Sequence, residues 1–582
     1  MKRIFYFLLP LMSLLPCRVG AWEVNFTSGL GDFTLVNLDG MAVETSDVLN
    51  ISAKTTWFQA MGGRLNGGKV AMSCSHREAD EPTDNWMITP QLTISSEDTW
   101  LTWDANSVHY DLRESYEVLL STEGAETDDF ETVLFSIDEE TYFPTHRMIS
   151  LADYAGCDVY IAFRHTSTSK YLLAVDNVFV GELSGTSLEA TDQTLHSSGN
   201  TGTHAVTGSL RNVGEALGLA SIECTLDDGN VLSQTFEALT LQPDEEQVWN
   251  FDVPVSLNEA TYYEVAAVDT NGERHWLLGD SIFCTNYPRT YLMEKVTGYW
   301  CNSCYTANLF LNEQKERFGD QMIEVAVQYP SNAGNDVGDL VYDEFYDQIT
   351  VYSLPSIIYD RNLASPQSGA KDTTKLWNAV IQPCDGLVSI ESAEYDGTNI
   401  SGTVRCEFAY DLDNSDDLYR WGFALLENKV ATTATQANNS TLYTDNEYYY
   451  LPSTILQPLY AFKHVVRGTA SAFEGLSGSV PATIEAGESY TYDYELEVPD
   501  RVSDTSAGNL IIVAYVLDTA TGVPVNSAAF TATENYPEGI SPAPSLTQKD
   551  EDAAWYTLDG RRIARPTTSG LYIRSGEKVL IK

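Results

Sequence analysis

The sequence predicts a multi-domain, mainly β fold that contains one α/β module. Over most of the 582 residues, short alternating apolar runs recur between Gly, Pro, Asn and Asp residues, a pattern typical of antiparallel strands. After Pro288 this pattern gives way to a strand, a helical period and a second strand, which indicates an α/β unit. Because domains are commonly ~100–150 residues long, we expect four or five domains.

The first 21 residues predict an export signal. Lys2 and Arg3 precede the apolar run Ile4–Pro16, and Val19-Gly20-Ala21 supplies the small residues after which a signal peptidase cleaves. This run, like every later one, is shorter than the ~20 apolar residues of a membrane helix. We therefore expect cleavage after residue 21 and a mature chain without a transmembrane segment. An uncleaved anchor and, because of Cys17, a lipoprotein signal are the alternatives.

The charge of the chain excludes nucleic acid as a partner. Its 33 basic and 83 acidic residues give a net charge of −50, which repels a phosphate backbone. Eight cysteines follow residue 21, too few for a disulfide scaffold of this length. Cys384 and Cys406 straddle a domain boundary and could pair across it, but the spacing alone assigns no such bridge.

Residues 22–185 predict a jelly-roll sandwich. Strand-like runs such as Trp100–Trp103, Tyr116–Leu120 and Val159–Phe163 alternate with turns, and no long helical period interrupts them.

Two motifs in this domain resemble a known family. Asp84-Asn85-Trp86-Met87-Ile88-Thr89-Pro90 and Ala174-Val175-Asp176-Asn177-Val178 resemble the choice-of-anchor or cleaved-adhesin jelly roll. The resemblance implies a surface or secreted protein, related in shape to carbohydrate-binding modules, with a glycan or an extracellular or host protein as ligand. Asp176 could help to hold a structural calcium ion; a polar residue that ends a strand is the alternative interpretation.

Two further stretches predict immunoglobulin-like sandwiches. Residues 186–287 contain strand-like runs such as Leu219–Leu226, with hairpin turns such as Asp227-Asp228-Gly229-Asn230. Residues 386–533 return to β runs such as Trp421–Leu426. Neither stretch carries recognisable chemistry, and we interpret the first as a spacer.

Residues 288–385 predict a thioredoxin-like module. A CxxC motif beside a strand–helix–strand pattern is a redox signal for this fold. The expected strands are Tyr291–Thr297, Met322–Gln328 and Ser356–Tyr359, and the expected helices run from about Ala307 to Phe318, over Leu340–Ile349 and over Thr374–Ile381.

The motif Cys301-Asn302-Ser303-Cys304 predicts thiol chemistry. At the start of a helix, backbone N–H groups and the helix dipole stabilise a thiolate, which can lower a cysteine pKa from ~8.5 to as little as ~3.5. Cys301 is therefore the expected nucleophile and Cys304 the resolving thiol, with Trp300 packed beside them. Glu294, on the preceding strand, is a candidate buried acid that exchanges a proton with Cys304, unless it faces solvent. The sequence offers no further ligands at zinc spacing, which argues against a metal here.

The residues Glu294–Cys301, followed by Cys304, and the later Phe462–Arg467 resemble an outer-membrane protein family with a thioredoxin-like core and an appended immunoglobulin-like domain. The resemblance spans about 288–532. Pro355 lies 51 residues after Cys304 and directly before a strand, where thioredoxin-like folds place a cis-proline against the active site, so a cis peptide bond is expected there. Where the family usually has proline after the second cysteine, Tyr305 stands here.

The C-terminus predicts a sorting signal. A proline-containing linker over 534–552 isolates residues 553–582. Within them, Trp555–Arg562, Gly570–Ile573 and Lys578–Lys582 resemble a type IX secretion sorting domain. This implies the type IX machinery as a partner and a final location on the outer membrane surface or outside the cell; a small β cap is the alternative.

Together these features predict an exported, adhesin-like protein that carries out thiol–disulfide exchange through Cys301 and Cys304. We expect no cofactor beyond this redox-active disulfide and the structural calcium. The alternative is a glycan- or protein-binding surface protein in which the thioredoxin fold is a scaffold. No nucleophile elbow, HExxH motif or placeable triad supports a hydrolase.

Overall fold

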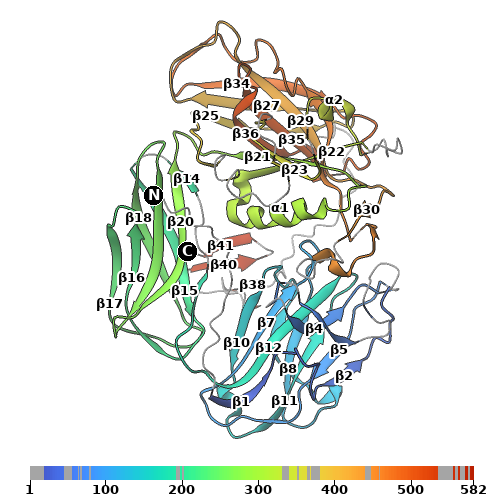
Figure 1. Cartoon of the computed structure of the whole chain (residues 1–582), viewed down its shortest axis with the longest axis vertical. Helices are drawn as coiled ribbons and strands as arrows, with labels where there is room; N and C mark the ends of the chain where they lie inside the picture. Colours follow the sequence, from blue (N-terminus) through green and yellow to red (C-terminus); the bar gives the residue numbers. More distant parts are fainter. Residues whose placement is uncertain are drawn as a thin grey trace. The chain divides into compact units, whose positions relative to one another are not determined.

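The structure, a computed structural model, describes most of the chain in two compact units (Figure 1). The described residues are 19–44, 51, 56–62, 64–65, 68–77, 80–191, 197–199, 202–330, 340–349, 351, 353–362, 367–368, 376, 380–439, 447–457, 459–506 and 508–534, with short strands between 555 and 581. Residues 1–18 of the expected signal and nearly all of the expected linker lie outside them. The first unit comprises residues 1–394 and 399–533, and the second comprises residues 395–398 and 534–582.

The N-terminal domain is a two-sheet antiparallel sandwich, as the sequence predicts. One sheet has the order β10-β7-β12-β4-β3 with β1 on β12, and the other has the order β2-β5-β11-β8-β9 with β6 on β11. The first consists of β1 (Val19–Val24), β3 (Trp57–Met61), β4 (Lys69–Cys74), β7 (Thr99–Ser107), β10 (Thr145–Ser150) and β12 (Leu172–Glu182). The second consists of β2 (Thr34–Asn37), β5 (Asn85–Ile88), β6 (Leu92–Thr93), β8 (Tyr116–Ser121), β9 (Thr132–Ile137) and β11 (Asp158–His165).

The core of this sandwich is aromatic. Trp103 and Phe163 project from the two sheets and meet edge to face, with ring centroids 5.8 Å apart. The indole of Trp103 donates a hydrogen bond to the hydroxyl of Tyr116 at 2.9 Å, so its one polar atom is satisfied inside the core. The alternation of apolar and polar residues in the strands therefore buries one face of each sheet in a core of its own.

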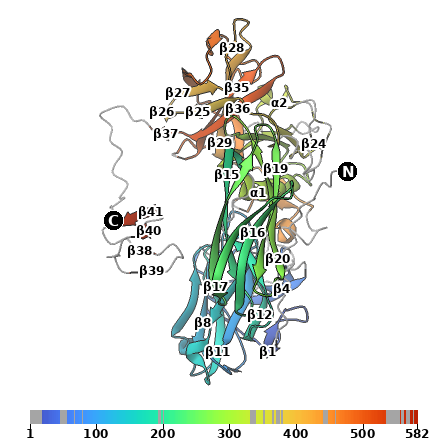
Figure 2. The same cartoon turned by 90° about the vertical axis from the view of Figure 1, so that its left-hand side faces the viewer.

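The next domain is a second sandwich with long strands (Figures 1 and 2). One sheet has the order β13-β15-β18 and the other β14-β20-β19-β16-β17, and Trp249, Phe251 and Tyr263 lie in the core. The strands are β13 (Leu188–Thr191), β14 (Ser197–Gly199), β15 (Gly202–Asn212), β16 (Leu217–Leu226), β17 (Val231–Leu241), β18 (Glu246–Val255), β19 (Ala260–Asp269) and β20 (Arg274–Cys284).

The α/β module follows. Strand β21 pairs in parallel with β22 and antiparallel with β23, and α1 packs on this sheet through Ala307, Phe310 and Leu311. The elements are β21 (Tyr291–Thr297), α1 (Tyr305–Phe318), β22 (Met322–Gln328), α2 (Asp343–Tyr346), β23 (Ser356–Tyr359) and β24 (Gln367–Ser368). The three strands and the first helix agree with the sequence-based expectation. The helix expected over Leu340–Ile349 is shorter, and most of Thr374–Ile381 lies outside the described residues.

The α/β module and the last sandwich share one sheet. Its order is β24-β23-β21-β22-β32-β29-β35-β36, and the parallel pair Ala326–Val465 joins β22 to β32. The shared strands of the last sandwich are β29 (Tyr419–Lys429), β32 (Lys463–Ala470), β35 (Leu510–Asp518) and β36 (Val523–Thr531). A second sheet contains β25 (Gly386–Ile390), β27 (Asn399–Phe408) and β34 (Ser489–Glu497). The sheet thus continues across the boundary expected between residues 385 and 386.

Short elements complete the chain. In the first unit and at its margins these are β26 (Glu394–Tyr395), β28 (Leu412–Asp413), β30 (Gln436–Ala437), β31 (Thr454–Ile455), β33 (Thr483–Ile484), β37 (Thr533–Glu534) and the 3₁₀ turns Thr127–Asp129, Ala152–Tyr154, Gly319–Gln321 and Glu447–Tyr450. The second unit contains a sheet of order β39-β38-β40-β41, formed by β38 (Trp555–Tyr556), β39 (Arg562–Ile563), β40 (Gly570–Arg574) and β41 (Glu577–Ile581).

The segment between β29 and β32, which we call the 430–462 segment, contacts the N-terminal sandwich within the first unit. His109 Nε2 lies 3.0 Å from the carbonyl oxygen of Leu459, and the hydroxyl of Tyr450 donates to the carbonyl of Met61 at 2.8 Å. The backbone N–H of Tyr110 donates to Glu447 Oε2 at 2.8 Å. Apolar residues of the sandwich, α1 and this segment form one buried cluster.

Candidate functional site

The candidate site is a disulfide between Cys301 and Cys304 at the start of α1. The two Cα atoms are 5.5 Å apart. Strand β21 ends at Thr297, and the backbone N–H of Cys301 donates to the carbonyl of Gly298 at 2.9 Å, so a tight turn carries the chain from strand to helix. Cys304 is fully buried and Cys301 is 6% exposed, so Cys301 is the more accessible of the two residues.

Glycine at 298 makes room for Trp300. A Cβ at this position would lie 3.0 Å from Trp300 Nε1 and 3.4 Å from Leu354 Cδ1, so Trp300 and Leu354 both approach the backbone of the CxxC loop. The Trp300 indole donates to the carbonyl of Tyr329 at 3.2 Å, and its side chain remains exposed. The expected place of Trp300 beside the cysteine loop agrees with this geometry.

Pro355 lies at the same end of the sheet. The Leu354–Pro355 peptide bond is cis, as the sequence predicts. Ser356 pairs with Val296 across β23 and β21, so Pro355 lies level with Thr297, at the entry to the CxxC loop. The structure therefore brings Cys301, Cys304, Trp300 and Pro355 to one end of β21.

Glu294 points elsewhere. Its carboxylate binds Arg361, with 2.9 Å between Oε1 and Nε, and Arg361 also donates to the Tyr515 hydroxyl at 2.7 Å. Burial raises the pKa of Glu294 above its ordinary value, and the Arg361 guanidinium opposes this rise. The contacts of Glu294 are thus with the shared sheet rather than with the cysteines, and its role as a proton carrier stays a prediction.

Lys295, the next residue, faces α1. Its ammonium donates to Asn308 Oδ1 at 2.9 Å and forms an ion pair with Glu324 of β22. His464 Nδ1 lies 3.6 Å from the other oxygen of Glu324. Although burial opposes ionisation, the Lys295 ammonium and then His464 hold the pKa of Glu324 well below its ordinary value. Sequence reasoning missed this pair, although strand alternation would have separated residue 294 from 295.

Strand β30 covers one edge of the CxxC loop. The Gln436 amide nitrogen, which is buried, donates to the carbonyl of Cys301 at 2.9 Å. The backbone N–H groups of Ala437 and Asn439 donate to the carbonyls of Tyr299 and Asn302 at 2.7 and 3.1 Å. The loop is therefore held by a strand that comes from the last sandwich.

Asp176 lies at a bulge between β7 and β12. The register shifts after Asp176, and Asn177 adopts φ 51°. Asn177 donates to one carboxylate oxygen of Asp104 at 2.7 Å, and His146 Nδ1 lies 2.6 Å from the other. Asp176 itself is buried beside these groups.

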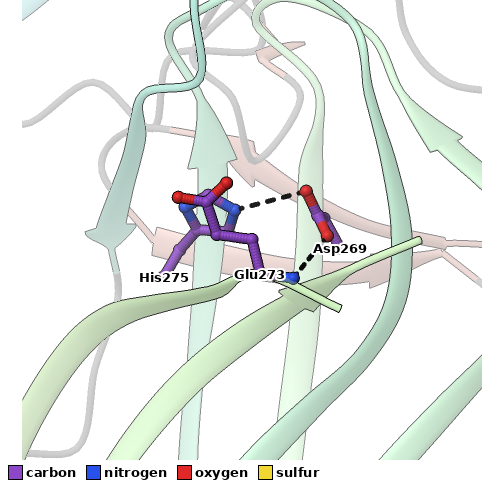
Figure 3. A group of neighbouring side chains, drawn as sticks. All are labelled: Asp269, Glu273 and His275. Carbon is purple, nitrogen blue, oxygen red and sulfur yellow. Dashed lines mark hydrogen bonds and ion pairs between the residues drawn. The ribbon is translucent and has the colours of Figure 1, made fainter. Parts of the chain in front are cut away.

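In the described part of the chain, one group of three side chains combines metal-ligating atoms: Asp269, Glu273 and His275, at the β19–β20 hairpin (Figure 3). His275 Nε2 lies 3.7 Å from Asp269 Oδ2, while the N–H of Glu273 donates to Asp269 Oδ1 at 2.8 Å. Burial opposes ionisation, but the backbone N–H groups of Glu273 and Asn271 and the other nearby donors together lower the pKa of Asp269. Asp176 does not belong to this group, and calcium binding at Asp176 stays a prediction.

Cys384 and Cys406 do not form the bridge that their positions allowed. Both thiols are buried and outside any disulfide. Burial raises the pKa of Cys384 to about 11 and that of Cys406 to about 12, so neither is a reactive thiolate near neutral pH.

The N-terminal sandwich is similar to known proteins. Residues 49–144 and 138–180 match the family model of the Cleaved Adhesin Domain. Over 172 residues the chain is 27% identical to Hemagglutinin A of Porphyromonas gingivalis. The aligned region covers 25% of this chain and 6% of Hemagglutinin A. The chain thus spans a small fraction of the length of this curated relative.

Two solved structures from Porphyromonas gingivalis resemble parts of the chain. The K3 cleaved adhesin domain of Lys-gingipain is 20% identical and covers 28% of this chain and 99% of its own, with a TM-score of 0.22. A domain of the outer membrane lipoprotein Omp28 is 19% identical and covers 26% of this chain and 91% of its own, with a TM-score of 0.15.

The family match supports the cleaved-adhesin resemblance of the jelly roll. The thioredoxin-like and type IX resemblances stay predictions. Among the described residues, no helix combines the length and the apolarity needed to cross a bilayer.

Proposed function

We propose that this chain is an adhesin-like protein of the cell surface or the medium, whose jelly roll binds a glycan or an extracellular protein. The observation that carries the proposal is the match of residues 49–180 to the Cleaved Adhesin Domain. The net charge of −50 supports a partner other than nucleic acid.

Binding of the purified full chain to a glycan array and to immobilised host matrix proteins tests this function. We expect saturable binding that an antibody fragment against residues 22–185 blocks. No binding on either surface, or binding that the fragment leaves unchanged, would contradict the proposal.

We propose further that residues 553–582 direct the chain through type IX secretion. Their resemblance to a sorting domain supports this route. Deletion of Trp555–Lys582 should retain the protein in the periplasm, as cell fractionation and surface labelling would show. Surface display of the truncated protein at the level of the full chain would refute it.

A second candidate function is thiol–disulfide exchange at Cys301 and Cys304. The observation that favours it is the disulfide at the start of α1, where the exposed Trp300 lies beside Cys301. The helix N-terminus stabilises a thiolate, and the two-residue spacing lets Cys304 attack a mixed disulfide on Cys301. The alternative is a static disulfide in a scaffold that supports the binding domain.

A redox titration in glutathione buffers, with mass-mapped alkylation of residues 301–304, separates these alternatives. We expect a reversible couple and insulin reduction that Cys301→Ser abolishes. Cys384→Ser is the matched control, because this buried thiol lies outside any disulfide. If glutathione cannot reduce and reoxidise the Cys301–Cys304 disulfide, or if activity survives Cys301→Ser, the disulfide is static and the α/β module is a scaffold.

A further inference from the structure

Alternation along β21 separates its two buried charges. Tyr291 and Met293 pack against the apolar face of α1, whereas Leu292 and Val296 pack in the cluster of the shared sheet. Successive residues of a strand point to opposite faces, so Lys295 shares the face of Tyr291 and Met293. Its hydrogen bond to Asn308 of α1 agrees with this placement.

Asn308 connects this charge to the disulfide. It lies four residues after Cys304, so helical geometry puts the two side chains on the same side of α1, about 5–6 Å apart at Cβ. The Lys295 ammonium contacts both Asn308 and the Glu324 carboxylate. The cation therefore lies between the first turn of α1 and the carboxylate, and it is the nearer charge to Cys304 along this chain of contacts.

Two tyrosines, a carboxylate and a histidine surround the Lys295–Glu324 pair and Asn308. Asn308 also donates to the Tyr460 hydroxyl at 3.0 Å and to the Tyr448 hydroxyl at 3.4 Å. Burial raises the pKa of both tyrosines, so they are neutral at physiological pH. The Glu447 carboxylate, in the 430–462 segment, raises the pKa of both tyrosines further. His464 of β32 contacts the Glu324 carboxylate.

We propose that the Lys295–Glu324 ion pair, which Asn308 joins to the first turn of α1, is a positioning device that favours the thiolate form of Cys304, the resolving cysteine. This inference rests on the proposed thiol–disulfide exchange and adds two residues to that site. Lys295 stabilises the thiolate by charge, and Glu324 moderates this effect while holding Lys295 in place.

The step that the pair assists is the closure of a mixed disulfide. The Cys301 thiolate attacks one sulfur of oxidised glutathione, a new S–S bond forms, and one glutathione thiolate leaves. Cys304 then loses its proton to solvent, and its thiolate attacks Cys301 Sγ and expels the second glutathione thiolate. The protein loses two electrons and two protons, and oxidised glutathione becomes two glutathione molecules after protonation.

The pH dependence of this closure tests the proposal in the full chain. Reduced protein is mixed with oxidised glutathione, and the decay of the glutathionylated species is followed by mass spectrometry between pH 5 and 9. Lys295→Met should raise the pH of half-maximal closure by about one unit. Below that pH, closure in the variant should be about tenfold slower than in the wild type. Glu324→Gln should lower the pH of half-maximal closure. Asp320→Asn, which removes an exposed carboxylate just after α1, is the matched control and should leave it unchanged.

Shifts of the closure pH in opposite directions for Lys295→Met and Glu324→Gln indicate a charge effect. Damage to the fold would instead slow closure in both variants. If Lys295→Met fails to fold, as a thermal melt would show, Glu324→Gln and the double variant Lys295→Met/Glu324→Gln decide the question. The double variant should close at nearly the wild-type pH. An unchanged or raised closure pH in Glu324→Gln overturns the inference. Absence of any mixed disulfide in the wild type overturns instead the exchange function on which it rests.

Discussion

Glu294 and Lys295 are adjacent charges that lie in separate parts of the interior. Glu294 and Arg361 are both buried, and Arg361 also lies over the rings of Phe473 and Tyr515, 4.5 and 4.3 Å from their centroids. The charge of Arg361 is tolerated in such a place because its three nitrogens each have a partner, in Glu294, the Ala472 carbonyl and the Tyr515 hydroxyl. Through its contacts with Glu294 of β21 and Tyr515 of β35, Arg361 links two strands of the sheet on which the disulfide is built and so stabilises that sheet.

Arg361→Met should therefore destabilise the protein strongly. Removing one partner of a buried ion pair costs about 3–5 kcal/mol, because the other charge stays buried without compensation. The denaturant midpoint measures the loss. Arg405→Met is the control, because its pair with Glu391 spans 3.7 Å near the surface and should change stability by less than about 0.5 kcal/mol. Equal effects of the two variants would contradict the assignment.

Glu324 gives the stability a defined pH dependence. Its pKa is lower in the folded protein than the ordinary value of 4.5, so the folded state binds fewer protons than the unfolded state. The stabilisation is present above pH ~4.5 and is lost as the pH falls toward the folded pKa, by up to about 1.4 kcal/mol per pH unit. Urea midpoints between pH 6 and 3 should fall more steeply for the wild type than for Glu324→Gln. Parallel curves would refute this.

At the scale of elements, two strand glycines of the last sandwich make a matched pair. A Cβ on Gly402 of β27 would lie 1.9 Å from the carbonyl oxygen of Ser392, a backbone atom, whereas a Cβ on Gly468 of β32 would meet nothing closer than 3.7 Å. Gly402→Ala should cost about 1–3 kcal/mol because the strand must shift. Gly468→Ala should be neutral or slightly stabilising. Thermal midpoints check both, and a larger loss at 468 would contradict the packing.

The elements also show what the sequence could predict. The spacing of Ala307, Phe310 and Leu311 is periodic, and α1 is found where that period predicts it. The joining of β22 to β32 carries no such signal, because Ala326 and Val465 are distant in sequence and meet through one pair. The site divides in the same way. The CxxC motif predicts the cysteine pair, and the cis bond at Pro355 follows from the resemblance to thioredoxin-like folds. The contacts of Gln436 and Glu324 join residues that are distant in sequence, so only the folded structure reveals them.

At the scale of the molecule, the first unit is held together by aromatic packing around Tyr448. Its ring lies 5.6 Å from that of Tyr305 at the start of α1 and 6.5 Å from that of His109 in the N-terminal sandwich, measured between centroids. Three distant stretches of sequence thus meet at one side chain.

Tyr448→Ala should loosen this junction. Removing a buried aromatic side chain costs about 3–5 kcal/mol, and here the loss falls on the contact between modules. Limited proteolysis should cut the 430–462 segment faster in the variant, with the N-terminal sandwich left intact. Tyr410→Ala, at an exposed position, should digest like the wild type. Unchanged cleavage of Tyr448→Ala would refute the role of this contact.

Strand β30 has a consequence for the size of any redox partner. The N–H groups of Ala437 in β30 and of Asn439 just after it donate to the carbonyls of Tyr299 and Asn302, so an extended polypeptide cannot add itself as a neighbouring strand along that edge. Trp300, the exposed residue next to Cys301, takes no part in these contacts. If the disulfide exchanges, rate constants measured by stopped flow should favour small thiols such as glutathione over denatured proteins. The chain would then exchange disulfides fastest with small thiols in its surroundings and more slowly with protein substrates such as insulin.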